Sequence, residues 1–333
     1  MPLHVQRDAA SLPRGTAVCM GAFDGLHRGH QALIKRARTH AKRVALVTFD
    51  PHPTAVLAPE RMPPMLHAPI QRERVAADLG VENLVLLPFD LAMSRMPPED
   101  FVRQFFSDGL APQAIVVGAD FRFGARRAGT AASLQHQVAS GGVVTDIVKL
   151  LSADAGKKVS SSDIRRALHN GNVAAAAQWL GRWHAVAGTV EHGAKRGRQL
   201  GFPTANLAPC GGMVPPTGIY ASVLTVWSED ASDYGARWPA VTSVGHNPTF
   251  TDAGAPLTVE THVLDQALGE RLYGLDVEVS FVKRLRDEQK FDGAEALVTQ
   301  MHRDADQARR ALSPDTLAST LTPPSPLYTK ASP

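Results

Sequence analysis

The chain has 333 residues, of which 44% are hydrophobic, and its formal net charge is +3. This length is comfortable for two globular domains with ordinary apolar cores. No stretch approaches the ~18 consecutive apolar residues of a membrane span, and Met1–Gly15 lacks the apolar core of a signal peptide. We therefore expect a cytoplasmic protein with no membrane partner. The two cysteines, Cys19 and Cys210, have no ligand spacing around them and support neither a disulfide framework nor a zinc site.

Charge is distributed unevenly between the two halves of the chain. Residues 1–182 contain 22 lysines and arginines against 15 aspartates and glutamates, whereas residues 183–333 contain 13 against 17. A basic first half suits an anionic ligand such as a nucleotide. The basic residues are scattered and lack interleaved aromatic residues, so the sequence does not predict a nucleic-acid partner.

The first half alternates short apolar runs with amphipathic stretches, as in a parallel sheet with helices on both faces. The expected strands are Thr16–Met20, Val44–Phe49, Leu84–Leu87 and Ala114–Gly118, and the expected helices are 29–41, 72–79, 101–106 and 163–180. Ligands of such folds collect at the carboxyl ends of the strands. We therefore predict a Rossmann-like α/β domain over residues 1–182.

A glycine-rich turn with two histidines follows the first expected strand. Glycine lets the backbone approach a phosphate closely, and a helix that begins near Gly29 directs unpaired N–H groups to the same place. His27 and His30 can donate hydrogen bonds to phosphate oxygens that gain charge during nucleotidyl transfer. The candidate nucleotide-binding residues of this turn are Gly21, Phe23, Asp24 and Gly29. The alternative is an ordinary turn with two surface histidines. The pairing of two histidines around a glycine favours the nucleotide-binding interpretation over this alternative.

Two further segments of the first half offer polar groups to a nucleotide. Asp120 follows an expected strand and can hold a ribose or a flavin edge, while Arg122 and the nearby arginines can contact phosphates. A mobile basic loop is an equally good interpretation of that segment. Ser160 and Asp163 form a Ser-x-x-Asp capping pattern before a helix, and the serine hydroxyls, helix N–H groups and Arg165 also suit a polyphosphate.

From residue 185 the apolar pattern changes to a period of two, which is typical of antiparallel strands. Alternating runs at 186–190, 219–226, 240–244, 257–264 and 275–285, separated by Gly/Pro turns, indicate a small barrel. An expected helix at 294–312 follows. Residues 313–333 hold five prolines and eight serines and threonines, which predicts a disordered tail. The change of period places the domain boundary at 182/183, with the second domain over residues 183–312.

The loop after the first barrel run is dense in glycine and cations, so its backbone N–H groups can wrap phosphates. The candidates are Gly193, Gly197 and Arg198. A flexible surface turn is the commoner interpretation of such a loop. Thr204 and Asn206 follow, and Mg²⁺ accepts neutral oxygens like theirs beside nucleotide phosphates. Glu260 lies on the polar face of its strand and can take a proton from an attacking hydroxyl, although a solvated strand glutamate is the alternative.

The motifs of the first half resemble those of the bacterial bifunctional riboflavin kinase and FAD synthetase family. Residues 27–30 are similar to the His-x-Gly-His signature of the nucleotidyltransferase superfamily, and residues 21–25, 50–53, 120–124 and 161–165 resemble further family motifs. The resemblance implies transfer of AMP from ATP to FMN with release of pyrophosphate. It implies that His27 and His30 steady the α-phosphate. It assigns Ser161, Ser162 and Arg165 to the pyrophosphate, and Asp120 and Phe123 to the flavin. Ser162 replaces the usual threonine, and Asp163 stands where a basic or neutral residue is commoner.

The second half resembles the flavokinase module, with its motifs in their usual order at 201–206, 218–220, 247–250, 259–262, 272–274 and 285–288. The resemblance implies a six-stranded barrel that binds Mg-ATP at Thr204 and Asn206. It makes Glu260 the base for the riboflavin 5′-hydroxyl and assigns Arg286 and Glu288 to the flavin. Riboflavin, FMN and ATP are then the small-molecule partners, and FMN and FAD are intermediate and product rather than prosthetic groups.

Two alternatives belong to other functional classes. An enzyme similar to the aminoacyl-tRNA synthetases would share the histidine signature and need a nucleic-acid partner, but the acidic second half disfavours it. A flavin-binding protein with only one activity retained, or none, is the second alternative, and the presence of every candidate residue argues against it. We expect a monomer or a weak homo-oligomer.

Overall fold

The computed structural model describes residues 3–149, 152–153, 157–193, 197, 200–228, 230–246, 257–266, 268–313 and 316. The chain divides into two compact units. The first holds the chain up to residue 63 together with residues 72–160, and the second holds residues 64–71 and the chain from residue 161. Most of the predicted tail lies outside the described residues.

The first unit is built on a six-stranded parallel sheet in the order β1-β4-β3-β2-β5-β8. The strands are β1 (His4–Gln6), β2 (Thr16–Met20), β3 (Arg43–Asp50), β4 (Asn83–Pro88), β5 (Ala114–Gly118) and β8 (Val144–Val148). β2 and β5 are buried along their whole length and coincide with the predicted apolar runs. The direction of strand addition reverses between them, and in open α/β sheets such a switch point forms the crevice where ligands bind.

Helices cover both faces of this sheet, as the alternating pattern predicts. The helices α1 (Arg28–Ala37) and α3 (Pro69–Asp78) contribute Leu33, Ile34, Ala37 and Ala76 to the core on one face. The helices α5 (Pro98–Val102), η3 (Arg103–Leu110, a π-helix) and α6 (Ala131–Val138) contribute the core of the other face, including Phe101 and Phe106. The smaller elements are η1 (Asp24–Leu26), α2 (Pro53–Leu57), η2 (Pro59–Arg61), α4 (Leu91–Ser94), η4 (Ala125–Arg127), η5 (Ala139–Gly141) and the hairpins β6 (Arg122–Phe123) with β7 (Gly129–Thr130) and β9 (Ser152–Ala153) with β10 (Lys157–Lys158).

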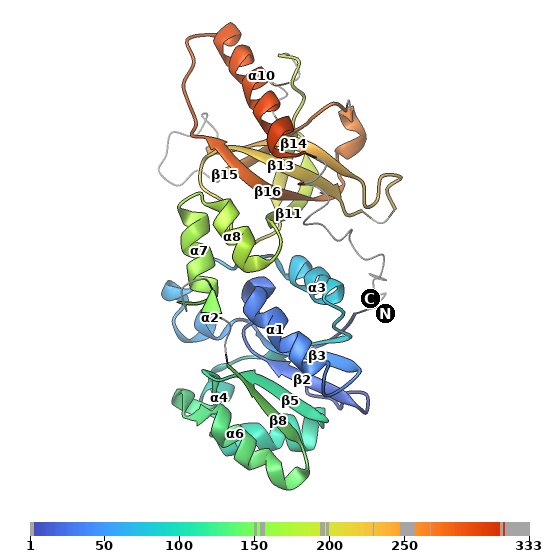
Figure 1. Ribbon diagram of the computed structural model, residues 1–333, viewed down its shortest axis with the longest axis vertical. Helices are drawn as coiled ribbons and strands as arrows, with labels where there is room; N and C mark the ends of the chain where they lie inside the picture. The colour runs from blue at the N-terminus through green and yellow to red at the C-terminus, as the bar shows by residue number, and fades with distance from the viewer. Residues whose placement is uncertain are drawn as a thin grey trace. The chain divides into compact units, whose positions relative to one another are not determined.

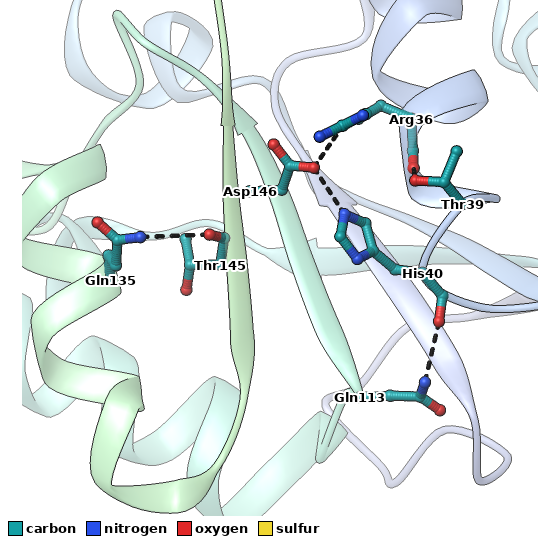
Figure 2. Close-up of polar contacts among 7 residues, drawn as sticks. All are labelled: Arg36, Thr39, His40, Gln113, Gln135, Thr145 and Asp146. Atoms are coloured by element: carbon teal, nitrogen blue, oxygen red, sulfur yellow. Dashed lines mark hydrogen bonds and ion pairs between the residues drawn. The ribbon is translucent and has the colours of Figure 1, made fainter.

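A polar cluster fastens the end of α1 to the edge strand β8 (Figure 2). The Asp146 carboxylate accepts hydrogen bonds from Arg36 Nε at 2.5 Å and from His40 Nε2 at 2.6 Å. Burial alone would raise the pKa of Asp146, but the hydrogen bonds from His40 and Arg36 outweigh it and lower that pKa. Gln113 Nε2 adds a hydrogen bond to the His40 carbonyl at 2.9 Å. Gln113 and His40 precede β5 and β3, so this part of the cluster lies at the amino-terminal ends of the strands, opposite the end at which the switch point binds ligands.

The second unit contains a closed antiparallel barrel in the order β11-β12-β15-β14-β13-β16. Its strands are β11 (His184–Glu191), β12 (Ala205–Pro209), β13 (Gly218–Val226), β14 (Arg237–His246), β15 (Leu257–Val263) and β16 (Asp276–Arg286), with a short helix η7 (Gly269–Leu272) before β16. Five of the six match the predicted alternating runs, which confirms the expected barrel. The C-terminal helix α10 (Ala294–Ala311) lies against the barrel (Figure 1). Its Ala305 and Ala308 belong to one apolar cluster with Ala221 and Val223 of β13.

Two helices replace the single one expected at 163–180. They are α7 (Ser161–His169) and α8 (Val173–Leu180), and the turn between them contains Gly171 at φ +71°, a conformation that few other residues adopt readily. A Cβ on Gly171 would lie 2.8 Å from Cδ of Arg284 in β16. Both helices belong to the compact unit of the barrel, and the domain boundary at 182/183 stays a prediction. Within the described ranges, no helix has the length and apolar character needed to cross a membrane.

Candidate active sites

The histidine turn of the first unit lies directly after the carboxyl end of β2, beside the switch point. Two bonds to β3 fix its position, because Gly21 N–H donates to the Val47 carbonyl at 3.1 Å and Thr48 Oγ1 donates to the Ala22 carbonyl at 3.2 Å. Positive φ angles at Phe23, Gly25 and Leu26 coil the chain tightly before α1 begins. The turn therefore presents the N-terminus of α1 at the edge where the fold binds ligands.

His27 and His30 form a stacked pair at that helix N-terminus. Their ring centroids are 3.7 Å apart with an interplanar angle of 18°, and Phe23 meets His30 edge-on at 5.1 Å. The Gly29 N–H donates to His27 Nδ1 at 3.2 Å, so the neutral His27 ring carries its proton on Nε2. A Cβ on Gly29 would approach His27 Cε1 to 3.0 Å. Glycine at this position therefore permits the ring placement that leaves Nε2–H as a donor.

Two other candidates of this turn are buried side chains. Phe23 is fully buried and Asp24 is almost so, which makes Phe23 a support for the His30 ring. A Cβ on Gly21 would meet that Phe23 ring at 3.5 Å, an ordinary contact distance. The sequence predicted nucleotide contacts for these residues, and those contacts stay predictions, whereas His27 is the N-cap residue of α1.

The loop after β5 lies beside the histidine turn, since β2 and β5 pair with Cys19 opposite Val116. Asp120 and Arg122 are exposed there, while Phe123 is buried against Phe101 at 5.6 Å. Phe121 stacks on Phe123 at 5.6 Å and is only partly buried. Phe123 therefore contributes to the core. The exposed side chains of this predicted flavin loop are those of Asp120 and Arg122.

The serine and arginine motif occupies the first turns of α7. Ser161 and Ser162 begin the helix, Asp163 pairs with Arg166, and Arg165 Nε donates to the Pro64 carbonyl at 2.7 Å. This motif belongs to the second compact unit, whereas the histidines belong to the first. The assignment of Ser161, Ser162 and Arg165 to pyrophosphate stays a prediction.

In the barrel, strand register brings the metal and base candidates together. Asn206 of β12 lies directly opposite Glu260 of β15, and Glu260 lies opposite Ser243 of β14. Directly opposed residues on neighbouring strands share one face of a sheet, with Cβ atoms about 5 Å apart. Val259 and Thr261, on either side of Glu260, are buried in the interior. The barrel wall therefore carries an amide, a carboxylate and a hydroxyl in one row.

Thr204 and Asn206 line a pocket with Gly193, Thr261 and Tyr273. A Cβ on Gly193 would lie 2.1 Å from Asn206 Nδ2, so only glycine leaves room for that amide. His262 Nδ1 donates to the Pro203 carbonyl at 2.8 Å and holds the segment against β15. Further along the loop, the Gly197 carbonyl accepts the Phe202 N–H at 2.8 Å. Arg198 and the motif at 247–250 lie outside the described residues.

Arg286 and Glu288 have different surroundings, although both were predicted to bind flavin. The Arg286 guanidinium binds Asp304 of α10 through Nε at 2.9 Å and Nη2 at 2.6 Å, and its Nη1 donates to the Asp287 carbonyl at 2.9 Å. Arg286 therefore fastens α10 to the barrel, a contact that the sequence did not reveal. Glu288 is exposed, beyond the end of β16.

The geometry offers two candidate sites of different construction. A histidine pair at a helix N-terminus beside the switch point defines a nucleotidyltransferase-type unit. A barrel wall with neutral oxygens beside a carboxylate suits transfer of a phosphoryl group to a hydroxyl.

Comparison with known proteins agrees with this class. Residues 9–163 match the FAD synthetase family and residues 180–312 match the riboflavin kinase family. The bifunctional riboflavin kinase/FMN adenylyltransferase of Pseudomonas fluorescens is 36% identical over 305 residues, covering 90% of this chain and 94% of that protein. The protein of the same description from Bacillus subtilis is 34% identical, covering 90% and 93%. A crystal structure described as a macrolide-efflux protein from Streptococcus pneumoniae shares 30% identity, covers 93% of this chain and 99% of that chain, and superimposes with a TM-score of 0.80.

The chain belongs to the family of bifunctional riboflavin kinase/FMN adenylyltransferases, and it carries both domains of that family. The family resemblance and the two-part fold predicted from the sequence are confirmed.

Proposed function

We propose that the barrel transfers the γ-phosphate of ATP to the 5′-hydroxyl of riboflavin, with Glu260 as the base, and that His27 and His30 then assist transfer of AMP to the FMN formed. The observation that carries this proposal is the direct opposition of Asn206 and Glu260 on β12 and β15. Asn206, the candidate ligand for Mg-ATP, is then on the strand next to Glu260, the candidate proton acceptor.

In the kinase reaction, Glu260 accepts the proton as the hydroxyl oxygen attacks the γ-phosphorus, and ADP leaves. Glu260 is half-buried on a strand with buried neighbours, and that strand is paired on both sides, so its backbone is held on a rigid wall. Positioning of this kind is the main contribution that proteins make to phosphoryl transfer.

The donor set beside Glu260 fits a hard cation. Thr204 and Asn206 offer neutral oxygens, and the space that Gly193 leaves for the Asn206 side chain shows that the amide is accommodated closely. Thr204 and Asn206 would hold Mg²⁺ together with the ATP phosphates. When bound, this ion neutralises charge on the phosphate oxygens.

In the adenylylation reaction, a phosphate oxygen of FMN attacks the α-phosphorus of ATP and pyrophosphate leaves. The Nε2–H of His27 and the N–H groups at the start of α1 donate to oxygens that gain charge. The edge-on contact with Phe23 holds the His30 ring beside His27. Cytoplasmic location, a monomeric or weakly self-associating state and the absence of a nucleic-acid partner stay predictions of the sequence.

Product analysis tests the proposal. The purified chain is incubated with riboflavin, ATP and Mg²⁺, and flavins are separated by chromatography. We expect FMN to appear first and FAD to follow, and FMN supplied directly to yield FAD. Accumulation of FMN without FAD would refute the role of the first unit, and unchanged riboflavin would refute the role of the barrel.

A further inference from the structure

Gly245 of β14 provides a space that the Glu288 carboxylate occupies. An ideal Cβ on Gly245 would lie 2.2 Å from Glu288 Oε1, 3.1 Å from its Cδ and 3.5 Å from its Oε2. These are the three nearest atoms, and all belong to the one side chain. Glu288 therefore lies directly over the α-carbon of Gly245, although 43 positions separate the two in the chain.

This space lies on the same face of the barrel wall as the proposed base. Ser243 and Gly245 are two residues apart on β14, so their side-chain directions are the same. Ser243 is directly opposite Glu260. Gly245 lies about 7 Å from Ser243 along β14. The Glu288 carboxylate over Gly245 is thus on the face that carries Glu260.

We propose that Gly245 is a positioning residue for riboflavin, because its missing side chain lets Glu288 reach this face. Glu288 then accepts a hydrogen bond from an N–H or O–H group of riboflavin while Glu260 faces the 5′-hydroxyl. This inference rests on the proposed function of the barrel and extends it to a residue that makes no contact with substrate itself.

The backbone at Gly245 does not require glycine. Its φ lies outside the positive range that disfavours other residues, and it pairs with Thr258 in the β14–β15 ladder. The Thr258 hydroxyl also donates to the Gly245 carbonyl at 3.1 Å. Alanine is therefore compatible with the strand, and the added methyl group displaces only the end of a flexible, exposed side chain.

Gly245→Ala in the full chain tests the proposal. We expect the KM for riboflavin to rise about tenfold or more, as loss of a hydrogen bond to a charged group does. We expect kcat, the KM for ATP, the adenylylation of FMN and the midpoint of thermal unfolding to stay close to those of the unsubstituted protein. Gly141→Ala is the matched control, because a Cβ there meets nothing within 4 Å. An unchanged riboflavin KM in Gly245→Ala would overturn the proposal, as would an equal loss of adenylylation.

A double-mutant cycle separates this inference from the function on which it rests. If Gly245 acts through Glu288, Glu288→Ala raises the riboflavin KM, and adding Gly245→Ala to it causes no further rise. Additive effects would refute action through Glu288. A normal riboflavin KM in Glu288→Ala would instead refute the flavin contact of Glu288, and absence of kinase activity from the unsubstituted chain would refute the proposed function.

Discussion

Removal of the Asp304 carboxylate should destabilise the barrel more than any other single charge deletion that we propose. The Arg286 and Asp304 side chains are only 16% and 4% exposed, and Gln300 Nε2 adds a bond to Asp304 Oδ1 at 2.9 Å. Asp304→Ala leaves the Arg286 guanidinium buried without its counter-charge. Breaking a buried pair in this way costs about 3–5 kcal/mol, a large part of the 5–15 kcal/mol that typically stabilises a protein.

Tryptophan fluorescence during urea unfolding measures this loss. All four tryptophans lie between residues 179 and 238, so their signal reports on the second unit alone. Asp306→Ala is the matched control on the same helix. Asp306 is 63% exposed and pairs with a half-exposed Arg309, so its removal should cost less than about 1 kcal/mol.

Two outcomes would refute the reasoning. A loss below about 1 kcal/mol in Asp304→Ala would show that the pair does not behave as a buried one. The double variant Arg286→Met with Asp304→Leu should be more stable than either single variant, because no uncompensated charge remains. If it were less stable than both, burial of charge would not be the source of the effect.

The remaining predictions concern the two reactions and pH. Glu260→Gln should abolish FMN formation from riboflavin and leave FMN-to-FAD conversion intact, as followed by chromatography; loss of both steps in a folded protein would contradict separate sites. His30→Ala should abolish FMN-to-FAD conversion and leave FMN formation from riboflavin intact, as measured by the same product assay. Burial lowers the pKa of His184 to about 4 from 6.5, against the opposing effect of its bond to the Met213 carbonyl. The unfolded chain therefore takes up a proton from pH 6.5 downward and the folded chain does not until about pH 4. The free energy of unfolding should thus fall by about 3 kcal/mol between these values. His184→Gln should lose this part of the pH dependence, and an unaltered profile would contradict it.

The sequence predicted elements best where apolar runs are continuous. β2 and β5 were predicted to the residue, because every position in them is buried. The edge strands β1 and β8 were not predicted, because they are short or partly exposed and carry no continuous apolar run. β12 has only five residues and ends at Pro209, which is too short for alternation to be evident. The helix expected at 163–180 is two helices, because Gly171 adopts a left-handed conformation that periodicity does not reveal.

Candidate site residues can be named from residue type, whereas their arrangement in space cannot. The histidine turn follows from glycines and histidines at a strand-to-helix junction, so local sequence was sufficient. The opposition of Asn206, Glu260 and Ser243 depends on the register of three strands, which no local pattern specifies. Likewise, the pairing of Arg286 with Asp304 depends on where α10 packs. A motif residue such as Arg286 can therefore have a structural partner that its motif does not indicate.

The grouping of α7 and α8 with the barrel bears on how this chain can be divided. α7 begins inside the first family match, which ends at residue 163, and α8 ends at residue 180, where the second match begins. Ala177 packs in the same apolar cluster as Trp183 and Ala221, and Gly171 fits against Arg284. A cut at the change of hydrophobic period would remove this support from the helix that carries Ser161 and Arg165. Residues 161–163 match the FAD synthetase family yet fold in the compact unit of the barrel, so the end of one family match is supported by the domain of the other.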